Sequence, residues 1–133
     1  MRSLFILPLV ALAASTATSA RNDPPGTRSA AALEKKLAGR IAGEPRRCLP
    51  TWDAQIMNVH DGVVLFRRNS RVIYKNDMDG CRILREDDIL QTRLFGTSQL
   101  CDGDIVQIID RTSRFGKGAC VFGPFVPYSR PAT

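Results

Sequence analysis

The sequence predicts an all-β fold, a small antiparallel barrel or sandwich of about six short strands. Between residues 54 and 123, short runs of alternating apolar and polar residues follow one another, separated by turn-forming residues such as Asp61-Gly62. No helical period interrupts these runs, and four cysteines lie within and beside them. Short strands, frequent turns and an even number of cysteines are typical of a small β domain that disulfides stabilise.

The 133 residues divide into four parts. Residues 1–20 are predicted to be a signal peptide, because Arg2 precedes an apolar run at 4–14 and small residues follow as far as Ala20. Residues 21–43 are predicted to form a polar linker and a short helix, residues 44–128 the disulfide-stabilised β domain, and residues 129–133 a tail. The apolar run is too short for a membrane span, which needs about 20 residues. The mature protein is therefore predicted to be periplasmic or secreted, with no transmembrane span.

The helix is predicted over residues 29–42, with Ser29 as its N-cap and Gly43 at its C-terminal end. Leu33, Leu37 and Ile41 are spaced four residues apart and form one narrow apolar stripe. We expect such a helix to lie against the following domain or to form only in part.

Residues 54–76 predict a meander of three strands joined by tight turns at Asp61-Gly62 and Asn69-Ser70. Two-residue turns place the following pairs opposite each other: His60 and Val63, Met57 and Phe66, Phe66 and Ile73, and Arg68 and Arg71. Side chains alternate between the two faces of a strand, and both faces of this meander are partly apolar. The sheet is therefore predicted to close on itself or to be covered on both sides.

Further strands are predicted at 89–95, 104–110 and 119–123, with a polar loop at 112–118. Beyond residue 123, Pro124, Pro127 and Pro131 are predicted to prevent regular pairing, because proline lacks the backbone N–H that a strand ladder needs. Trp52 is the only tryptophan, and it is expected to close one end of the core.

Cys48, Cys81, Cys101 and Cys120 are predicted to form two disulfides, as expected for an even number of cysteines in an exported chain. The absence of a Cys-x-x-Cys pair argues against a redox, haem or zinc site. Cys48 and Cys81 flank a meander of three strands, so they are expected at opposite ends of it, too far apart to be bonded. The same argument separates Cys101 from Cys120. Of the two remaining arrangements we prefer Cys81–Cys101 with Cys48–Cys120, because the first closes a short loop and the second joins the ends of the domain.

Four fragments of the domain share a recognisable pattern: Cys48-Leu49-Pro50, RVIYKN at 71–76, LCDGDI at 100–105 and CVFGPF at 120–125. They resemble a family of small exported bacterial proteins of unknown function with four cysteines. The resemblance covers residues 48–128 and implies export and a four-cysteine domain. It implies no catalytic residue.

We predict that the protein is not an enzyme and that it has no catalytic residue, no metal site and no cofactor. His60-Asp61 is the only histidine beside a carboxylate, and the chain has no Gly-x-Ser-x-Gly motif. Residues 77–80 resemble part of a calcium loop, but Lys75 stands where the first carboxylate ligand would be needed. Residues 86–88 form one acidic cluster, which a solvated loop explains better than a pair of catalytic carboxylates does.

The chain is basic, with 19 Lys and Arg residues against 13 Asp and Glu residues. Arg67, Arg68 and Arg71 surround the second turn of the meander, and Lys75 is predicted on the same face as Arg68 and Arg71. These four residues are the candidate anion-binding group; the alternative is a set of solvated side chains at a hairpin tip.

The expected function is that of a non-catalytic binding or accessory protein of the bacterial envelope that contacts an anionic ligand. The alternative is an inhibitor of a secreted hydrolase that presents the loop at 112–118. The expected partner is a polyanionic envelope component or a protein, and nucleic acid is not expected.

Overall fold

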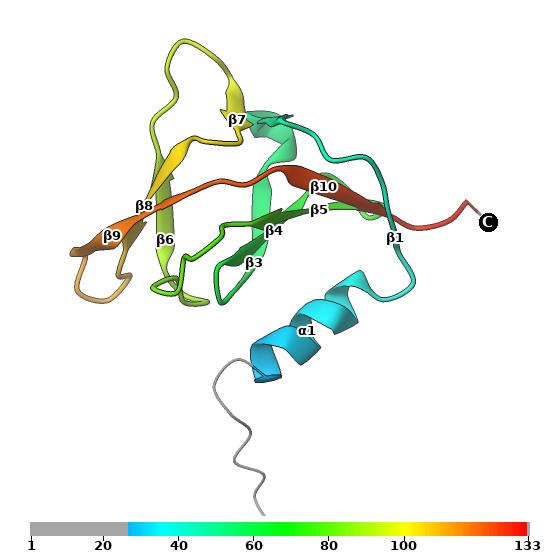
Figure 1. Ribbon diagram of the computed structural model, residues 1–133, viewed down its shortest axis with the longest axis horizontal. Coiled ribbons are helices and arrows are strands. Elements are labelled where there is room, and N and C mark those ends of the chain that lie inside the picture. Colours follow the sequence, from blue (N-terminus) through cyan, green and yellow to red (C-terminus); the bar gives the residue numbers. More distant parts are fainter. Residues whose placement is uncertain (1–26, 133) are drawn as a thin grey trace, which may run out of the picture.

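The structure, a computed structural model, describes residues 27–132, and within them it contains one α-helix and ten strands in three antiparallel sheets (Figure 1). The helix is α1 (Thr27–Leu37), and the strands are β1 (Ile41–Ala42), β2 (Cys48–Pro50), β3 (Gln55–His60), β4 (Val63–Arg67), β5 (Val72–Asp77), β6 (Ile89–Thr92), β7 (Gln99–Cys101), β8 (Ile105–Ile109), β9 (Gly116–Val121) and β10 (Phe125–Ser129). The sheet orders are β1-β10-β5-β4-β3, β2-β7 and β6-β8-β9. The all-β prediction is confirmed, in its sandwich-like form, because no sheet of the described residues closes into a barrel. The predicted signal peptide lies outside the described residues.

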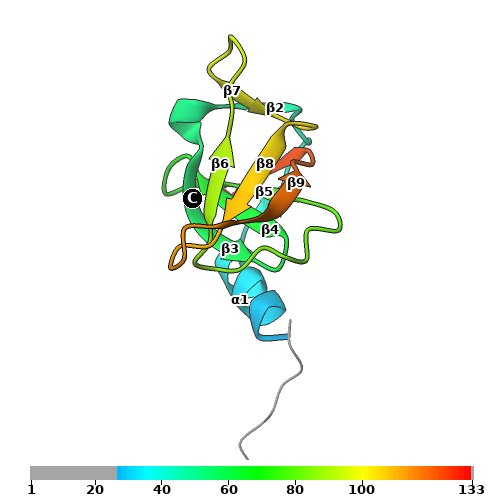
Figure 2. The ribbon, with the colours of Figure 1, turned by 90° about the vertical axis from the view of Figure 1, so that its left-hand side faces the viewer.

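The core lies between the five-stranded sheet and the three-stranded sheet. Figure 2 shows β6, β8 and β9 in front of β3, β4 and β5, as two layers. Three phenylalanines meet between them: Phe66 on β4, Phe122 and Phe125, with ring centroids 5.7 to 6.0 Å apart. Val106 and Ile108 of β8 are fully buried against this cluster. Burying each such side chain stabilises the fold by roughly 1.5–3 kcal/mol.

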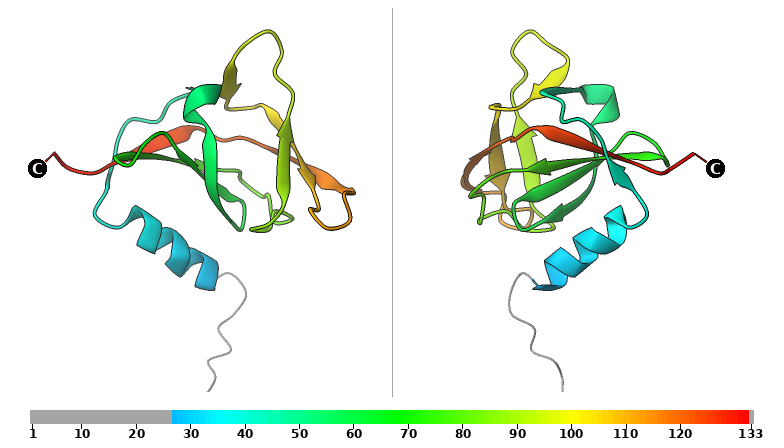
Figure 3. Two further views of the ribbon diagram at one scale, coloured as in Figure 1. Left: turned by 180° about the vertical axis from the view of Figure 1, so that it is seen from behind. Right: turned by 45° about the vertical axis from the view of Figure 1, so that its right-hand side comes forward.

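The outer face of the five-stranded sheet carries α1 (Figure 3). Leu65 and Ile73 are buried on this face, whereas the neighbouring residues Val64 and Tyr74 point into the core. The alternation of side chains along a strand places them on opposite faces. The sheet is therefore covered on both sides, which is one of the two arrangements that its apolar pattern predicts.

The first hairpin of the meander is confirmed at its turn and differs from the prediction farther along. His60 pairs with Val63, and Asp61 and Gly62 both have positive φ, as a two-residue turn requires. A β-bulge at Met57 then shifts the pairing, so Ile56 lies opposite Phe66. The bulge adds one residue to β3, which periodicity alone does not reveal.

The second turn is one residue longer than the predicted turn. The side-chain Oδ1 of Asn69 accepts hydrogen bonds from the backbone N–H groups of Arg71 and Val72, each at 2.9 Å, and Arg68 N–H donates to Val72 O at 3.3 Å. The chain therefore reverses through three residues, and Tyr74, not Ile73, lies opposite Phe66. Arg68 therefore faces Val72 and not Arg71, and the one-residue shift moves the side chains of β5 to the other face.

The helix ends earlier than the prediction of residues 29–42. It stops at Leu37, and Gly39 (φ 71°) turns the chain, which is the role predicted for Gly43. Ile41 and Ala42 then pair with β10 as strand β1. The five-stranded sheet thus begins before residue 44 and continues to Ser129, inside the predicted tail.

Strand β10 contradicts the prediction that proline prevents pairing after residue 123. It lies between β1 and β5, with Pro127 opposite Tyr74. The carbonyl of Pro127 accepts a hydrogen bond from Gly43 N–H at 2.7 Å, so its nitrogen also points toward the short β1 side. The missing N–H therefore costs no hydrogen bond to β5. This is the permissive position that proline needs within a sheet.

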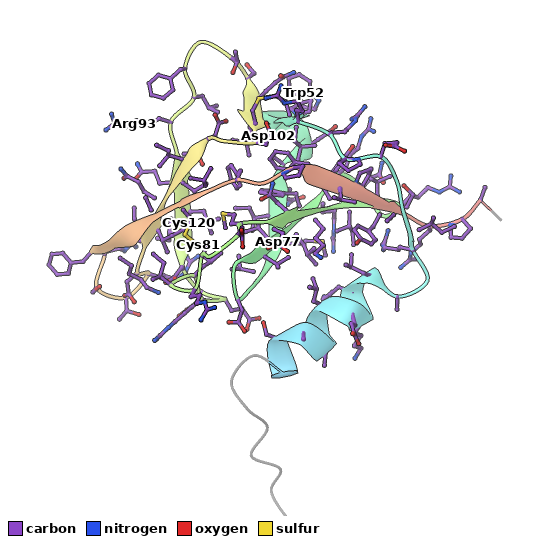
Figure 4. The ribbon with its side chains drawn as sticks, viewed as in Figure 1. Trp52, Asp77, Cys81, Arg93, Asp102 and Cys120 are labelled. Atoms are coloured by element: carbon purple, nitrogen blue, oxygen red, sulfur yellow. A yellow bond between two sulfur atoms is a disulfide. The ribbon has the colours of Figure 1, made fainter. Side chains whose placement is uncertain are left out.

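The disulfides are Cys48–Cys101 and Cys81–Cys120, so the preferred pairing is wrong. Cys48 and Cys101 lie directly opposite each other in the β2–β7 ribbon, with Cα atoms 4.0 Å apart. Figure 4 shows Cys81, in the connection between β5 and β6, beside Cys120 of β9. The arrangement that the meander geometry rejects is indeed absent. The choice between the other two depends on the pairing of β2 with β7, and neither strand is among those predicted.

Other differences lie at element ends. Strand β6 stops at Thr92, short of residue 95, and β9 begins at Gly116, inside the predicted loop at 112–118. Trp52 does not close the core, because 74% of it is exposed. Leu49, which is fully buried, packs there against the core cluster.

Candidate anion-binding site

A hollow of ≈ 360 Å³ lies beside the last turn of α1, and we call it the basic hollow. Its walls come from α1, β3, the β4–β5 hairpin and the chain segments after α1 and β10. Its lining residues are Lys35, Lys36, Arg40, Met57, Arg67, Asn69, Ser70, Ile73 and Arg130. Five of them are cationic and none is acidic. Cations without a neighbouring carboxylate create a strongly positive local potential, which attracts anions.

Arg40 is the fixed member of this group. Its Nη1 donates to Arg71 O at 2.6 Å and to Tyr128 O at 3.5 Å, and its Nη2 donates to Ser70 O at 3.3 Å. These bonds tie the segment that follows α1 to the hairpin loop and to β10. Burial lowers the pKa of the Arg40 guanidinium, and the positive charges of Arg130 and Arg67 lower this pKa further. The charges of Arg130 and Arg67 therefore repel the Arg40 guanidinium, and a bound anion would relieve that repulsion.

The other four cations are exposed on three separate elements. Lys35 and Lys36 lie on α1, Arg67 ends β4, and Arg130 follows β10. The backbone N–H of Arg130 donates to Arg71 O at 3.1 Å, so the hairpin loop positions this residue too. None of the four side chains forms an ion pair with a carboxylate in the part of the chain that the structure describes. Among the described residues, therefore, no carboxylate neutralises these four charges.

Only Arg67 of the candidate anion-binding group lies in the basic hollow. Arg68 forms an ion pair with Asp53, with Nε and Oδ2 3.2 Å apart. Arg71 has an exposed side chain, and it contributes its carbonyl to Arg40. Lys75 lines a different hollow, of ≈ 400 Å³, under the apolar stripe of α1. The expected common face of Lys75, Arg68 and Arg71 does not form, because the second turn shifts the register by one residue.

Four of the five cations were not predicted from the sequence: Lys35, Lys36, Arg40 and Arg130. A local signal existed for two of them, since Lys36 and Arg40 are four residues apart in the predicted helix and would share one side of it. No local sequence pattern indicated Arg130, because only the pairing of β10 with β5 brings this residue to the β4–β5 hairpin.

A second groove, of ≈ 410 Å³, lies near β7 at the end of the molecule remote from α1, where Figure 4 shows Arg93. Its lining residues are Gln91, Arg93, Phe95, Gly103, Asp104, Ile105 and Gln107. It contains one base and one acid, and Oδ2 of Asp104 already accepts the N–H of Cys101 at 2.7 Å. This groove therefore carries no net charge that would select an ion.

The acidic residues at 86–88 are not gathered into a site. Glu86 and Asp87 are exposed, whereas Asp88 is buried. Oδ2 of Asp88 accepts hydrogen bonds from Lys117 Nζ at 2.6 Å and from Arg85 N–H at 2.8 Å, so its role is structural. Among the side chains that the structure describes, no group of three His, Cys, Asp or Glu residues could hold a metal ion.

The loop between β8 and β9 forms a rigid tip. Oδ1 of Asp110 accepts hydrogen bonds from Thr112 N–H at 2.9 Å, Ser113 N–H at 2.7 Å and Ser113 Oγ–H at 3.0 Å. The hydrogen bonds from Ser113 are the main cause of the lowered pKa of Asp110. Arg114 has positive φ (64°), and 76% of Phe115 is exposed beside it. The loop thus presents an apolar ring on an ordered support.

Comparisons with protein-family models, with curated proteins and with solved structures gave no match. No helix among residues 27–132 is long and apolar enough to cross a membrane.

Proposed function

We propose that this is a non-catalytic binding or accessory protein of the bacterial envelope, periplasmic or secreted, whose basic hollow holds an anionic group of an envelope component. One observation carries the proposal: five cationic residues line a single hollow that contains no carboxylate. Two disulfides indicate an oxidising compartment, which agrees with an exported protein.

The chemistry of the hollow favours binding over catalysis. Its charged side chains are lysines and arginines, which supply hydrogen-bond donors, and its described lining contains no carboxylate or imidazole that could act as a general base. A single exposed ion pair contributes only about 0–1 kcal/mol, so affinity would come from several cations acting on one anion. Such binding weakens as salt concentration rises, because exposed charges are screened.

Retention on an immobilised polyanion tests the proposal. The variant Arg67→Glu with Arg130→Glu should elute at much lower salt than the wild type. The matched control is Arg68→Glu with Arg71→Glu, which makes the same change in net charge at neighbouring positions outside the hollow. The control should elute close to the wild type, and circular dichroism would verify that both variants fold. Equal elution of the two double variants would show that retention reflects total charge only, and the proposal would fail.

The rigid tip supports a second candidate function, the inhibition of a secreted hydrolase. An exposed aromatic ring on a preorganised loop suits insertion into a pocket of another protein, since little conformational entropy remains to be lost. Tight association with one hydrolase that resists high salt and is lost on Phe115→Ala would support this function. Capture of a partner that is insensitive to Phe115→Ala would count against it.

A further inference from the structure

The basic hollow has a size and a composition that restrict its ligand further, and this inference rests on the proposed function. The cations surround one compact space of ≈ 360 Å³, and they do not line an extended track across the surface. A polymer with well-separated carboxylates would place only one or two charges in such a space. A single group that carries two charges would use the converging cations more completely.

The hydrogen-bond donors of the hollow also favour a doubly charged group. Three of the five cations are arginines, and a guanidinium presents parallel N–H donors that match two oxygens of a phosphate. Arg40 is held in place by the backbone carbonyls of Arg71 and Ser70, so its charge needs no rearrangement before a ligand arrives. A phosphomonoester has three terminal oxygens that can be shared among several such donors.

The wall of the hollow also contains apolar surface. Met57 is half-buried there, and Ile73, which is 4% exposed, lies beneath the cations. The carbon skeleton that carries a phosphate could contact these side chains. An isolated inorganic ion would leave them unused.

We propose that the basic hollow takes the doubly charged phosphate of a phosphomonoester, with Arg40, Arg67 and Arg130 around its oxygens and Lys35 and Lys36 closing the site from α1. The phosphate belongs either to a soluble sugar phosphate or to a lipid head group. Both sources share the same terminal group, and a comparison of soluble and vesicle-borne phosphates distinguishes them.

A phosphomonoester changes its charge near neutral pH, and the described residues that line the hollow include no Asp, Glu or His. The charged groups facing the hollow are the five lysines and arginines, and Glu34 on α1 faces the neighbouring hollow with Lys75. Lysine and arginine do not titrate between about pH 5.5 and about pH 7.5. A phosphomonoester gains its second charge at a pKa of about 6, so its doubly charged fraction rises about fourfold over that interval. A sulfate ester keeps one charge throughout.

The experiment is a titration of the intact protein, followed by amide NMR, with glucose 6-phosphate and glucose 6-sulfate as matched probes. Binding of the phosphate should tighten about fourfold between about pH 5.5 and about pH 7.5, while binding of the sulfate stays constant. Arg67→Glu should abolish the phosphate-induced shifts, whereas Arg93→Glu, the same charge change in the remote groove, should preserve them. Vesicles containing phosphatidate, compared with vesicles containing the diester phosphatidylglycerol, provide the lipid arm. Preference for phosphatidate together with weak binding of the sugar phosphate would assign the site to a lipid head group.

Equal affinity for the sulfate and the phosphate, or a phosphate affinity that does not change with pH, would overturn the phosphomonoester assignment. The proposed function would stand in that case, provided that the polyanion still binds and is released by Arg67→Glu with Arg130→Glu. Failure to bind the polyanion and both sugar esters would overturn both proposals.

Discussion

We predict that breaking the ion pair between Lys117 and Asp88 strongly lowers the free energy of unfolding. Lys117 Nζ lies 2.6 Å from Asp88 Oδ2, and the two side chains are 22% and 2% exposed. Replacing Lys117 by Met keeps the length and apolar contacts of the side chain but leaves the buried carboxylate without its cation. Removing one partner of a buried pair typically costs about 3–5 kcal/mol, because the remaining charge is desolvated and uncompensated.

This loss is large for a domain of this size. Single domains are stable by only about 5–15 kcal/mol, so Lys117→Met should remove a substantial fraction of the total. Urea unfolding followed by fluorescence or circular dichroism would measure it as a lower midpoint at an unchanged slope. In the double variant with Asp88→Asn the buried charge is gone, and the amide oxygen can still accept the N–H of Arg85. The double variant should therefore be more stable than Lys117→Met alone.

A cost below about 1 kcal/mol for Lys117→Met would refute this reasoning, because that is the range of solvent-exposed pairs. A double variant less stable than Lys117→Met would also refute it. In that case the carboxylate would be stabilised by its hydrogen bond to Arg85, and its charge would not need Lys117.

Two further predictions concern backbone geometry and pH. A Cβ at Gly123 would overlap the backbone oxygen of Asp77, whereas a Cβ at Gly116, where φ is not positive, would have no other atom within 4 Å. Gly123→Ala should therefore lower the urea midpoint far more than Gly116→Ala, and similar midpoints would contradict the close approach. The pKa of Asp110 in the folded protein lies below its ordinary value. The hydrogen bonds that its carboxylate accepts therefore order the β8–β9 loop fully above the ordinary pKa of aspartate. This order is lost as pH falls through the lowered pKa of Asp110. The amide signal of Ser113 should report this transition, and Asp110→Asn should remove it; an unchanged pH profile in that variant would assign the transition to another group.

The sequence alone was sufficient for the features that depend on neighbouring residues. Alternation between apolar and polar side chains predicted the all-β class, and Asp61-Gly62 predicted the first hairpin turn. The opposite ends of an up-down-up meander excluded one of three cysteine pairings, and that pairing is absent. These predictions succeed because strand periodicity and turn conformation are local properties.

Features that depend on a single hydrogen bond or on an inserted residue could not be predicted in this way. The bonds that Asn69 accepts lengthen the second turn by one residue, and the bulge at Met57 adds one to β3. Because side chains alternate with a period of two, the longer turn reverses the faces of β5, and the bulge changes the pairing at the start of β3. The candidate anion-binding group depends on those faces, so most of its members lie apart in the structure.

The basic hollow itself was decided by the tertiary structure. Arg40, Arg67 and Arg130 are far apart in the chain, and they meet because β10 pairs with both β1 and β5. That pairing is possible because the nitrogen of Pro127, which carries no hydrogen, points away from β5. No local pattern in the sequence indicates this orientation. The sequence thus determined the kind of fold and the basic character of the chain. Long-range strand pairing determined which cations share one space, because their proximity is a property of the assembled sheet.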